Sequence, residues 1–350
     1  MNTALKMDET MSADELFGKD AFARLDESDD ELFYTRDRFV QHLDATALAT
    51  VEDLIGQLIV EERPAILDLM ASWDSHIPPG INPSRVVGLG LNENELRKNP
   101  VLTEYVVHDL NRNPMLPFPD ASFDAVINIV SVDYMTHPVE VFGEVGRILK
   151  PGGLYLVVFS SRMFPQKATQ VWRQSGERER IILVEEFFRH AKLFDAPAVF
   201  ISKGRPRPAD DKYAHLGIPS DPIYALYADK IGSNGDRKHR PELNSEYGSP
   251  LPEATLKERV AAVKENLRCP HCGEQMRKWE VPNTPFTTWE NEFMYICFND
   301  TCPYLMRGWD VMNKQGNRGI SYRLMYDPIR DRCMPVPVPS LDALKEGIIG

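Results

Sequence analysis

Apolar and polar positions along the chain follow two different periods. Residues 45–62 place apolar side chains three and four positions apart, which predicts a helix with one buried face. Short, continuous apolar runs rich in β-branched residues follow at 64–70, 85–91, 104–110, 123–131 and 152–160. Runs of this kind are typical of strands that are buried on both faces of a parallel sheet.

Helical patterns alternate with these runs. Residues 137–150 are amphipathic and end at a Pro-Gly-Gly turn, and residues 177–193 predict a longer helix. Further apolar runs at 196–204 and 222–230 predict two more strands. The alternation predicts an α/β fold, with a Rossmann-like, mostly parallel sheet that carries helices on both faces.

The connection between the first two strand runs is short. Residues 71–84 include prolines at positions 78, 79 and 83. A parallel crossover normally needs a dozen or more residues. We therefore expect any helix in this connection to be very short.

Composition and charge narrow the function classes. The chain has 350 residues, which favours two domains, and a formal net charge of −12 that argues against binding to nucleic acid. The first 35 residues carry ten acids and three bases, and we expect them to be mobile. There is no apolar run of membrane-spanning length and no signal-peptide pattern, so we expect a cytoplasmic protein without membrane contact.

Four cysteines fall into two close pairs, Cys269 with Cys272 and Cys297 with Cys302. In a chain without an export signal, such pairs indicate metal ligands rather than disulfides. Four thiolates suit a tetrahedral zinc ion and leave no coordination position for catalysis, so the predicted zinc is structural. The alternative is a set of metal-free core cysteines. Cys333 is expected to be a free thiol.

The segments CPHCG and YICFNDTCPY resemble the Ogr/Delta-type zinc-binding module of phage transcription activators. This resemblance implies a small β zinc ribbon, but not a role in transcription. Residues 266–323 hold seven Lys or Arg and six Asp or Glu, whereas a DNA-binding surface is usually far more basic.

Two stretches resemble class I S-adenosylmethionine (SAM)-dependent methyltransferases of the type 11 sort. They are LPFPDASFDAVINIVSVDYMTHP at 116–138 and EVGRILKPGGLYLVV at 144–158, and the likeness extends over residues 64–232. The resemblance implies a final antiparallel strand pair and a ligand beyond the carboxyl ends of the strands. It also implies a glycine-rich loop after the first strand, a ribose-binding acid after the second, and an acid near the adenine after the third, here Asp109.

The sequence departs from this pattern where the family contacts SAM. In a D-x-G-x-G-x-G register that begins at Asp68, the glycine positions hold Met70, Ser72 and Asp74, and the ribose acid position holds Gly90. Two outcomes are open. SAM binds with the residue at 92 or 93 in place of the missing acid, or the pocket holds another ligand or none.

The resemblance and the altered loop together define candidate site residues. Those for the cofactor SAM are Asp68, Ser72, Trp73, Asn92, Asp109 and Ser131. If the methyl acceptor must lose a proton, the candidate bases are His42, His76 and Asp133. The alternatives are structural: Trp73 fills space that a helix would have filled, both histidines are structural, and Asp44, just before a predicted helix, is an N-cap.

We therefore expect five segments along the chain: an acidic mobile segment at 1–35, a methyltransferase-like Rossmann domain at 36–232, a linker and helix at 233–265, a zinc ribbon at 266–326, and an extended tail at 327–350. Three functions remain open. The chain is a SAM-dependent methyltransferase whose ribbon aids binding of an acceptor or partner, an inactive scaffold with the same fold, or a zinc-ribbon regulator. The sequence specifies neither the acceptor nor the oligomeric state.

Overall fold

The computed structural model divides the chain into two units, Met1–Asn244 and Ser245–Gly350. The structure describes residues 17–349 apart from 19, 217, 234, 237, 242, 244, 248–252, 283–288, 290, 301 and 318. Within the described residues, no helix combines the length and apolar character that a membrane crossing requires.

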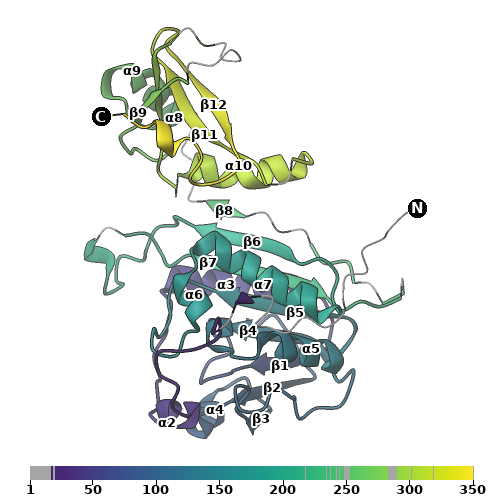
Figure 1. The fold of residues 1–350 in the computed structure, drawn as a ribbon. Coiled ribbons are helices and arrows are strands. Elements are labelled where there is room, and N and C mark those ends of the chain that lie inside the picture. Colours follow the sequence, from purple (N-terminus) through teal and green to yellow (C-terminus); the bar gives the residue numbers. More distant parts are fainter. Residues whose placement is uncertain are drawn as a thin grey trace. The chain divides into compact units, whose positions relative to one another are not determined.

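The first unit contains a mostly parallel sheet, as the apolar runs predict (Figure 1). Its strands lie in the order β3-β2-β1-β4-β5-β7-β6. Strands β1 to β5 are parallel, whereas β7 runs antiparallel to both β5 and β6. The bounds are β1 Ala65–Leu69, β2 Arg85–Gly90, β3 Glu104–Val107, β4 Phe123–Ile129, β5 Leu149–Phe159, β6 Ala198–Lys203 and β7 Ile223–Asp229. The expected final antiparallel pair is confirmed.

Helix α3 (Ala45–Leu58) covers one face of this sheet. Its Val51, Leu54 and Ile55 are buried in one core with strand residues such as Ile66 and Leu156. The helix begins where the sequence predicts, because Asp44 accepts hydrogen bonds from the backbone N–H groups of its first turn. The N-cap interpretation of Asp44 is therefore confirmed.

The other face is covered by α5 (Pro138–Ile148) and α7 (Glu177–Ala191). The ring of Phe142 in α5 lies 4.9 Å from that of Tyr155 in β5 and 5.0 Å from that of Phe188 in α7. Shorter helices complete the unit: α2 Asp30–Tyr34, α4 Glu93–Lys98, α6 Gln170–Gln174 and the 3-10 turns η1 Val132–Tyr134 and η2 Ala214–Leu216. Between β1 and β2 there is no helix, not even a short one, so residues 70–84 form an irregular loop.

The described part of the N-terminal segment packs onto the first unit instead of lying free. The Lys167 side chain is fully buried, and its Nζ forms ion pairs with Asp26 and Asp30 at 3.3 and 3.2 Å. Asp30 also pairs with Arg24 at 2.7 Å. These buried charges need partners, and so they hold residues 24–30 in place. The expected mobile segment 1–35 is wrong for this stretch, and residues 1–16 and 19 lie outside the described residues.

The second unit is built on a four-stranded antiparallel sheet in the order β12-β11-β10-β9. Helix α10 packs beside β11, where the Ser321 hydroxyl donates to the Leu305 carbonyl at 2.6 Å. The elements are β8 Glu246–Tyr247, α8 Glu253–Ala261, α9 Val263–Asn266, β9 Arg277–Glu280, β10 Phe293–Ile296, α10 Pro303–Lys314, β11 Ser321–Asp327, β12 Arg332–Val338 and η3 Lys345–Gly347.

The boundaries of the second unit differ from those expected. Residues 327–350 are not a separate tail, because β12 pairs along its whole length with β11 and Val338 is fully buried. Pro335 and Pro337 are tolerated because β12 is an edge strand, where the N–H groups on the outer side have no neighbouring strand to which they could donate hydrogen bonds. The helical part of the expected linker, 253–266, also lies in this unit, since Val263 is buried beside the cysteines.

Candidate functional site

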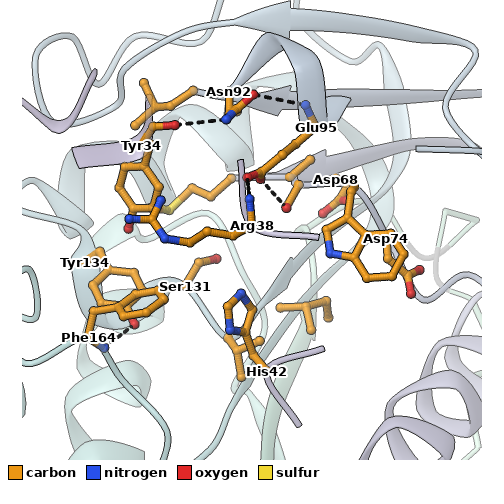
Figure 2. Close-up of a pocket in the computed structure, with 18 of the residues that line it drawn as sticks. Tyr34, Arg38, His42, Asp68, Asp74, Asn92, Glu95, Ser131, Tyr134 and Phe164 are labelled. Atoms are coloured by element: carbon orange, nitrogen blue, oxygen red, sulfur yellow. Dashed lines mark hydrogen bonds between the residues drawn. The ribbon is translucent and has the colours of Figure 1, made fainter. Parts of the chain in front are cut away.

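A cavity of about 440 Å³ opens beyond the carboxyl ends of β1 to β4. Its lining includes eight of the nine candidates drawn from the sequence, the exception being Asp133. The eight are His42, Asp68, Ser72, Trp73, His76, Asn92, Asp109 and Ser131. Figure 2 shows several of them turned toward a common space together with Tyr34, Arg38, Glu95 and Phe164.

The path of the loop after β1 explains why β2 ends in glycine. Met70 has φ 62°, a left-handed conformation that is costly for any residue except glycine, and the Ala71 N–H then bonds to the Leu89 carbonyl at 2.8 Å. A side chain at Gly90 would collide with the Ala71 carbonyl oxygen. An acid at the end of β2 is therefore excluded by the backbone that crosses it.

This loop path predicts the effect of Gly90→Ala. The added methyl group has to displace backbone, so we expect a loss of about 1–3 kcal/mol in the free energy of unfolding. The matched control is Gly143→Ala in α5, where nothing lies within 4 Å of the added Cβ and a helical alanine is favourable. Chemical denaturation of both variants gives the comparison. Equal stability of the two would mean that the loop does not cross Gly90 in this way.

Hydrogen bonds from polar side chains hold the loop after β1, which lacks the family's glycines, in one conformation. The Ser72 hydroxyl donates to Glu95 Oε2 at 2.6 Å. The Asn99 amide donates to the Ser72 carbonyl at 2.9 Å and to the Ser75 hydroxyl at 2.8 Å. Asn99 and Ser75 are both buried, and each satisfied buried hydrogen bond stabilises one geometry.

Asn92 and Glu93, the residues proposed to replace the ribose acid, are occupied elsewhere. Asn92 caps α4 by accepting from the Glu95 N–H at 3.0 Å, and its amide donates to the Tyr34 carbonyl at 3.0 Å. Glu93 instead accepts from the Tyr105 hydroxyl at 3.1 Å, at an exposed position outside the cavity lining. Asn92 therefore lines the cavity as a structural residue, and Glu93 does not reach it.

A different carboxylate, that of Glu95 in α4, lies in the cavity lining. It is 6% exposed, lines the cavity, and accepts from the Arg38 backbone N–H at 2.6 Å through Oε1. The sequence analysis missed it. The sequence does contain one signal for it. Asn92 is a typical N-cap residue, and a Glu three residues after an N-cap lies in the first turn of the helix, here close to the end of β2.

Asp68, near the end of β1, is a buried residue of the cavity lining. It is 4% exposed, and burial raises the pKa of its carboxyl group to about 7, although a hydrogen bond from Ser75 and the nearby His76 act in the opposite direction. A cationic group in the cavity would favour the ionised form of this carboxyl.

The two candidate histidines differ in how freely they can take part in proton transfer. His76 has φ 53°, and its Nδ1 lies 3.3 Å from Asp74 Oδ2; the hydrogen bond to His76 lowers the pKa of Asp74. The ring of His42 lies 5.6 Å from that of Phe164, and among the described residues its nitrogens have no hydrogen-bond partner. Burial lowers the pKa of His42, which favours a neutral imidazole that can accept a proton. Of the two, His42 is the better placed base.

Arg38 is a second residue that the sequence analysis missed. Its guanidinium lies over the rings of Phe33 at 4.6 Å and Phe164 at 5.6 Å, and its Nη2 donates to the Phe33 carbonyl at 2.9 Å. Within the described part of the chain, no carboxylate lies within 4.0 Å of the Arg38 guanidinium. Arg38 therefore brings a positive charge to the cavity that its protein neighbours do not neutralise.

The ends of β3 and β4 supply the remaining candidates. Asp109 Oδ1 accepts from the Asn111 N–H at 2.9 Å, and the Ser131 hydroxyl accepts from Asn128 at 2.9 Å. Asp133 is 3% exposed, burial raises its pKa to about 7, and it does not line the cavity. Asp133 is therefore the one candidate base that the cavity lining does not include, whereas His42 and His76 both belong to it.

The second unit brings the four paired cysteines to one point. All four Sγ atoms lie within 4.8 Å of one another, with 3.8 Å between Cys269 and Cys302 and 3.6 Å between Cys272 and Cys297. Zinc–sulfur bonds of ~2.3 Å in a tetrahedron place the sulfurs ~3.8 Å apart. The thiols therefore fit one structural zinc ion, as predicted, and Cys333 is a free thiol outside this group.

Comparison with known families agrees with this geometry. Residues 79–157 match the family described as a methyltransferase domain, and residues 268–315 match the Ogr/Delta-like zinc finger. Both families are those that the sequence motifs resemble. A search of curated proteins gave no match.

Many solved structures resemble the first part of the chain. One is a putative methyltransferase of Haloferax volcanii, solved in complex with the Trm112 methyltransferase activator, with 18% identity, a TM-score of 0.38 and coverage of 53% of this chain and 91% of that chain. Another is a putative methyltransferase of Bacillus halodurans, with 14% identity, a TM-score of 0.37 and coverage of 54% and 100%. A SAM-dependent methyltransferase of Aquifex aeolicus shows 13% identity, a TM-score of 0.35 and coverage of 54% and 92%.

Proposed function

We propose that this chain, which carries a methyltransferase domain and an Ogr/Delta-like zinc finger, binds SAM in the cavity of its first unit and transfers the methyl group to a small acceptor. The observation that carries the proposal is the lining of the cavity. Acidic groups stand beside a cation without an acidic partner at the sheet edge where Rossmann-like folds bind their ligands.

The residues present fit the parts of SAM. Asp109, at the end of β3, is the family's position for an acid near the adenine. Glu95, which lines the cavity and bonds to Ser72, is assigned to the ribose in place of the missing acid, and Asp68 offers a carboxyl to the ammonium group of the methionine part. Arg38 offers its guanidinium to the carboxylate. The N-terminus of a helix after β1 could bind this carboxylate through its backbone N–H groups, but here the loop after β1 leads into no helix. In this assignment Arg38 supplies the positive charge instead.

Bound SAM supplies an activated methyl group, so the chain has to position the reactants and manage one proton. The rings of Tyr134 and Phe164, 6.0 Å apart and stacked, form part of the wall that excludes water. His42, beside Phe164, accepts the proton that a hydroxyl or amine acceptor loses.

Two variants test the assignment through the choice of ligand. Arg38→Gln is expected to weaken S-adenosylhomocysteine binding at least tenfold, about 1.4 kcal/mol, because the ligand carboxylate loses its partner. The same variant should bind 5′-methylthioadenosine, which lacks the amino-acid part, as the unmodified protein does. Asp109→Asn should weaken both ligands, because both contain adenine.

Calorimetric titration of the unmodified protein and of both variants, each zinc-loaded, gives the six dissociation constants. An Arg38 variant that loses both ligands equally would contradict the assignment of this residue. An inactive scaffold remains the alternative, and it predicts that none of these ligands binds. The proposal includes two further predictions: the zinc finger helps to bind the acceptor or a partner protein, and the protein is cytoplasmic.

A further inference from the structure

Charge is divided between the two ends of the cavity. The acidic lining residues come from the N-terminal segment, from β1 and the loop after it, and from the segments that follow β2 and β3: Asp30, Asp68, Asp74, Glu95 and Asp109. The residues that follow β5 and β6 contribute Arg162 and Lys212, and no acid from these segments lines the cavity. The charged lining residues at this second end are therefore both cations, although the whole chain carries a net charge of −12.

The two cations flank one aromatic ring. Lys212 Nζ lies 4.9 Å and Arg162 Cζ lies 5.2 Å from the centre of the Tyr213 ring. Within the described ranges, the Lys212 ammonium has neither a hydrogen bond nor a carboxylate within 4.0 Å. Contact with one ring places both positive groups at the same part of the cavity wall.

Nearby acids that do not line the cavity form ion pairs with Arg162 and with Arg207. Arg162 Nε donates to Asp221 Oδ1 at 3.1 Å, but the same oxygen accepts from Arg207 at 2.7 Å. Arg207 also pairs with Asp211 at 3.0 Å and with Asp44 at 3.5 Å. None of the three carboxylates lines the cavity, and Asp44 and Asp221 are buried. Of these acids only Asp221 bonds to Arg162, and it orients the guanidinium, whose Nη1 has no hydrogen-bond partner among the residues that the structure describes.

Apolar side chains line the space beside these cations. Met163 and Phe164 follow Arg162 directly in the lining, and the ring of His42 lies 5.6 Å from that of Phe164. Leu43 and Leu48 add further apolar side chains to the cavity lining. A ligand that fills this end therefore meets an apolar surface, a base, and two cationic groups.

We propose that the methyl acceptor is a small carboxylic or phosphoric acid with an apolar body and a hydroxyl group, whose anionic group binds Arg162 and Lys212. This inference rests on the proposed function and names its substrate class. The hydroxyl oxygen forms the new bond to the methyl carbon as the sulfur–methyl bond breaks, with its electron pair left on sulfur. The hydroxyl proton passes to His42, and the products are a methyl ether and S-adenosylhomocysteine.

Matched pairs of probes test the class without knowledge of the natural acceptor. The first pair is 4-hydroxybenzoate and its uncharged amide, and the second is phenyl phosphate and phenol. Each probe is titrated into the full-length, zinc-loaded chain saturated with S-adenosylhomocysteine. We expect the charged member of at least one pair to bind tenfold or more tightly than the neutral member, and the pair that shows this distinguishes a carboxylate from a phosphate site.

Lys212→Gln should reduce that preference at least threefold, because the variant loses the positive charge, and this exposed lysine has no hydrogen bond or ion pair within the described residues whose loss would disturb the fold. Lys238→Gln, at an exposed lysine outside the cavity lining, should leave it unchanged. Equal binding of charged and neutral probes, no binding of any probe, or a preference that persists unchanged in the Lys212 variant would overturn the proposal. If S-adenosylhomocysteine itself fails to bind, the proposed function fails, and the same probe pairs titrated into the free chain still report whether this end prefers anions.

Discussion

Replacing Asp68 with Asn is expected to stabilise the first unit at neutral pH and to weaken its binding of SAM. Burial raises the pKa of Asp68 from 3.8 to about 7. Between these values the folded chain holds a proton that the unfolded chain has released, so the stability of the unmodified protein falls as pH rises through this window. Asn cannot ionise and removes this penalty.

The expected gain has a defined pH dependence. The variant and the unmodified protein should be equally stable near pH 4, and the variant should gain about 4 kcal/mol above pH 7, or roughly 8–16 °C in Tm. Thermal denaturation from pH 4 to pH 8 measures this difference. A constant difference across the range would contradict the raised pKa.

Asp133→Asn is the matched control for Asp68→Asn. Asp133 is equally buried, and its pKa is also raised to about 7, but it lies outside the cavity lining. Both variants should be stabilised at neutral pH, whereas only Asp68→Asn should weaken SAM binding, since only Asp68 faces the ligand. Loss of binding in both variants would indicate a structural effect instead of a ligand contact.

Removal of zinc is expected to unfold the second unit and leave the first unit folded. The four cysteines are part of the core of the second unit, packed with Val263, Leu305, Leu324 and Val338. A core of this size depends on its metal, since zinc contributes on the order of 10 kcal/mol in zinc-finger peptides. Chelation should therefore make residues 245–350 sensitive to protease while S-adenosylhomocysteine binding persists.

Cys297→Ser should reproduce the effect of chelation, and Cys333→Ser is its control. Cys333 is a half-buried free thiol outside the group of four. A colorimetric assay on denatured protein should find one zinc per chain in the control and much less in Cys297→Ser. A Cys297 variant with full zinc content and unchanged proteolysis would rule out the four-cysteine site.

Features that depend on local sequence could be predicted. The β-branched runs gave the strands of the first unit because strands buried on both faces need apolar residues throughout. The cysteine pairs predicted the metal site because the two members of each pair are close together in the sequence. Asp44 could be recognised as an N-cap because a cap acts on the residues that follow it directly.

Features that depend on distant contacts could not be predicted. Arg38 and Glu95 meet across 57 residues through a backbone hydrogen bond, and no local pattern marks either residue. The reason for Gly90 appears only when the loop after β1 is seen to cross it. The sequence predicts an extended tail at 327–350, and only the pairing of β12 with β11 shows that Pro335 and Pro337 occupy an edge strand.

The most direct test of the central claim is calorimetric titration of the zinc-loaded chain with SAM and with S-adenosylhomocysteine. The cavity geometry predicts one site per chain with a dissociation constant on the order of micromolar for each ligand. Absence of binding at millimolar concentrations of both ligands would contradict the methyltransferase assignment and favour a scaffold that has kept the fold.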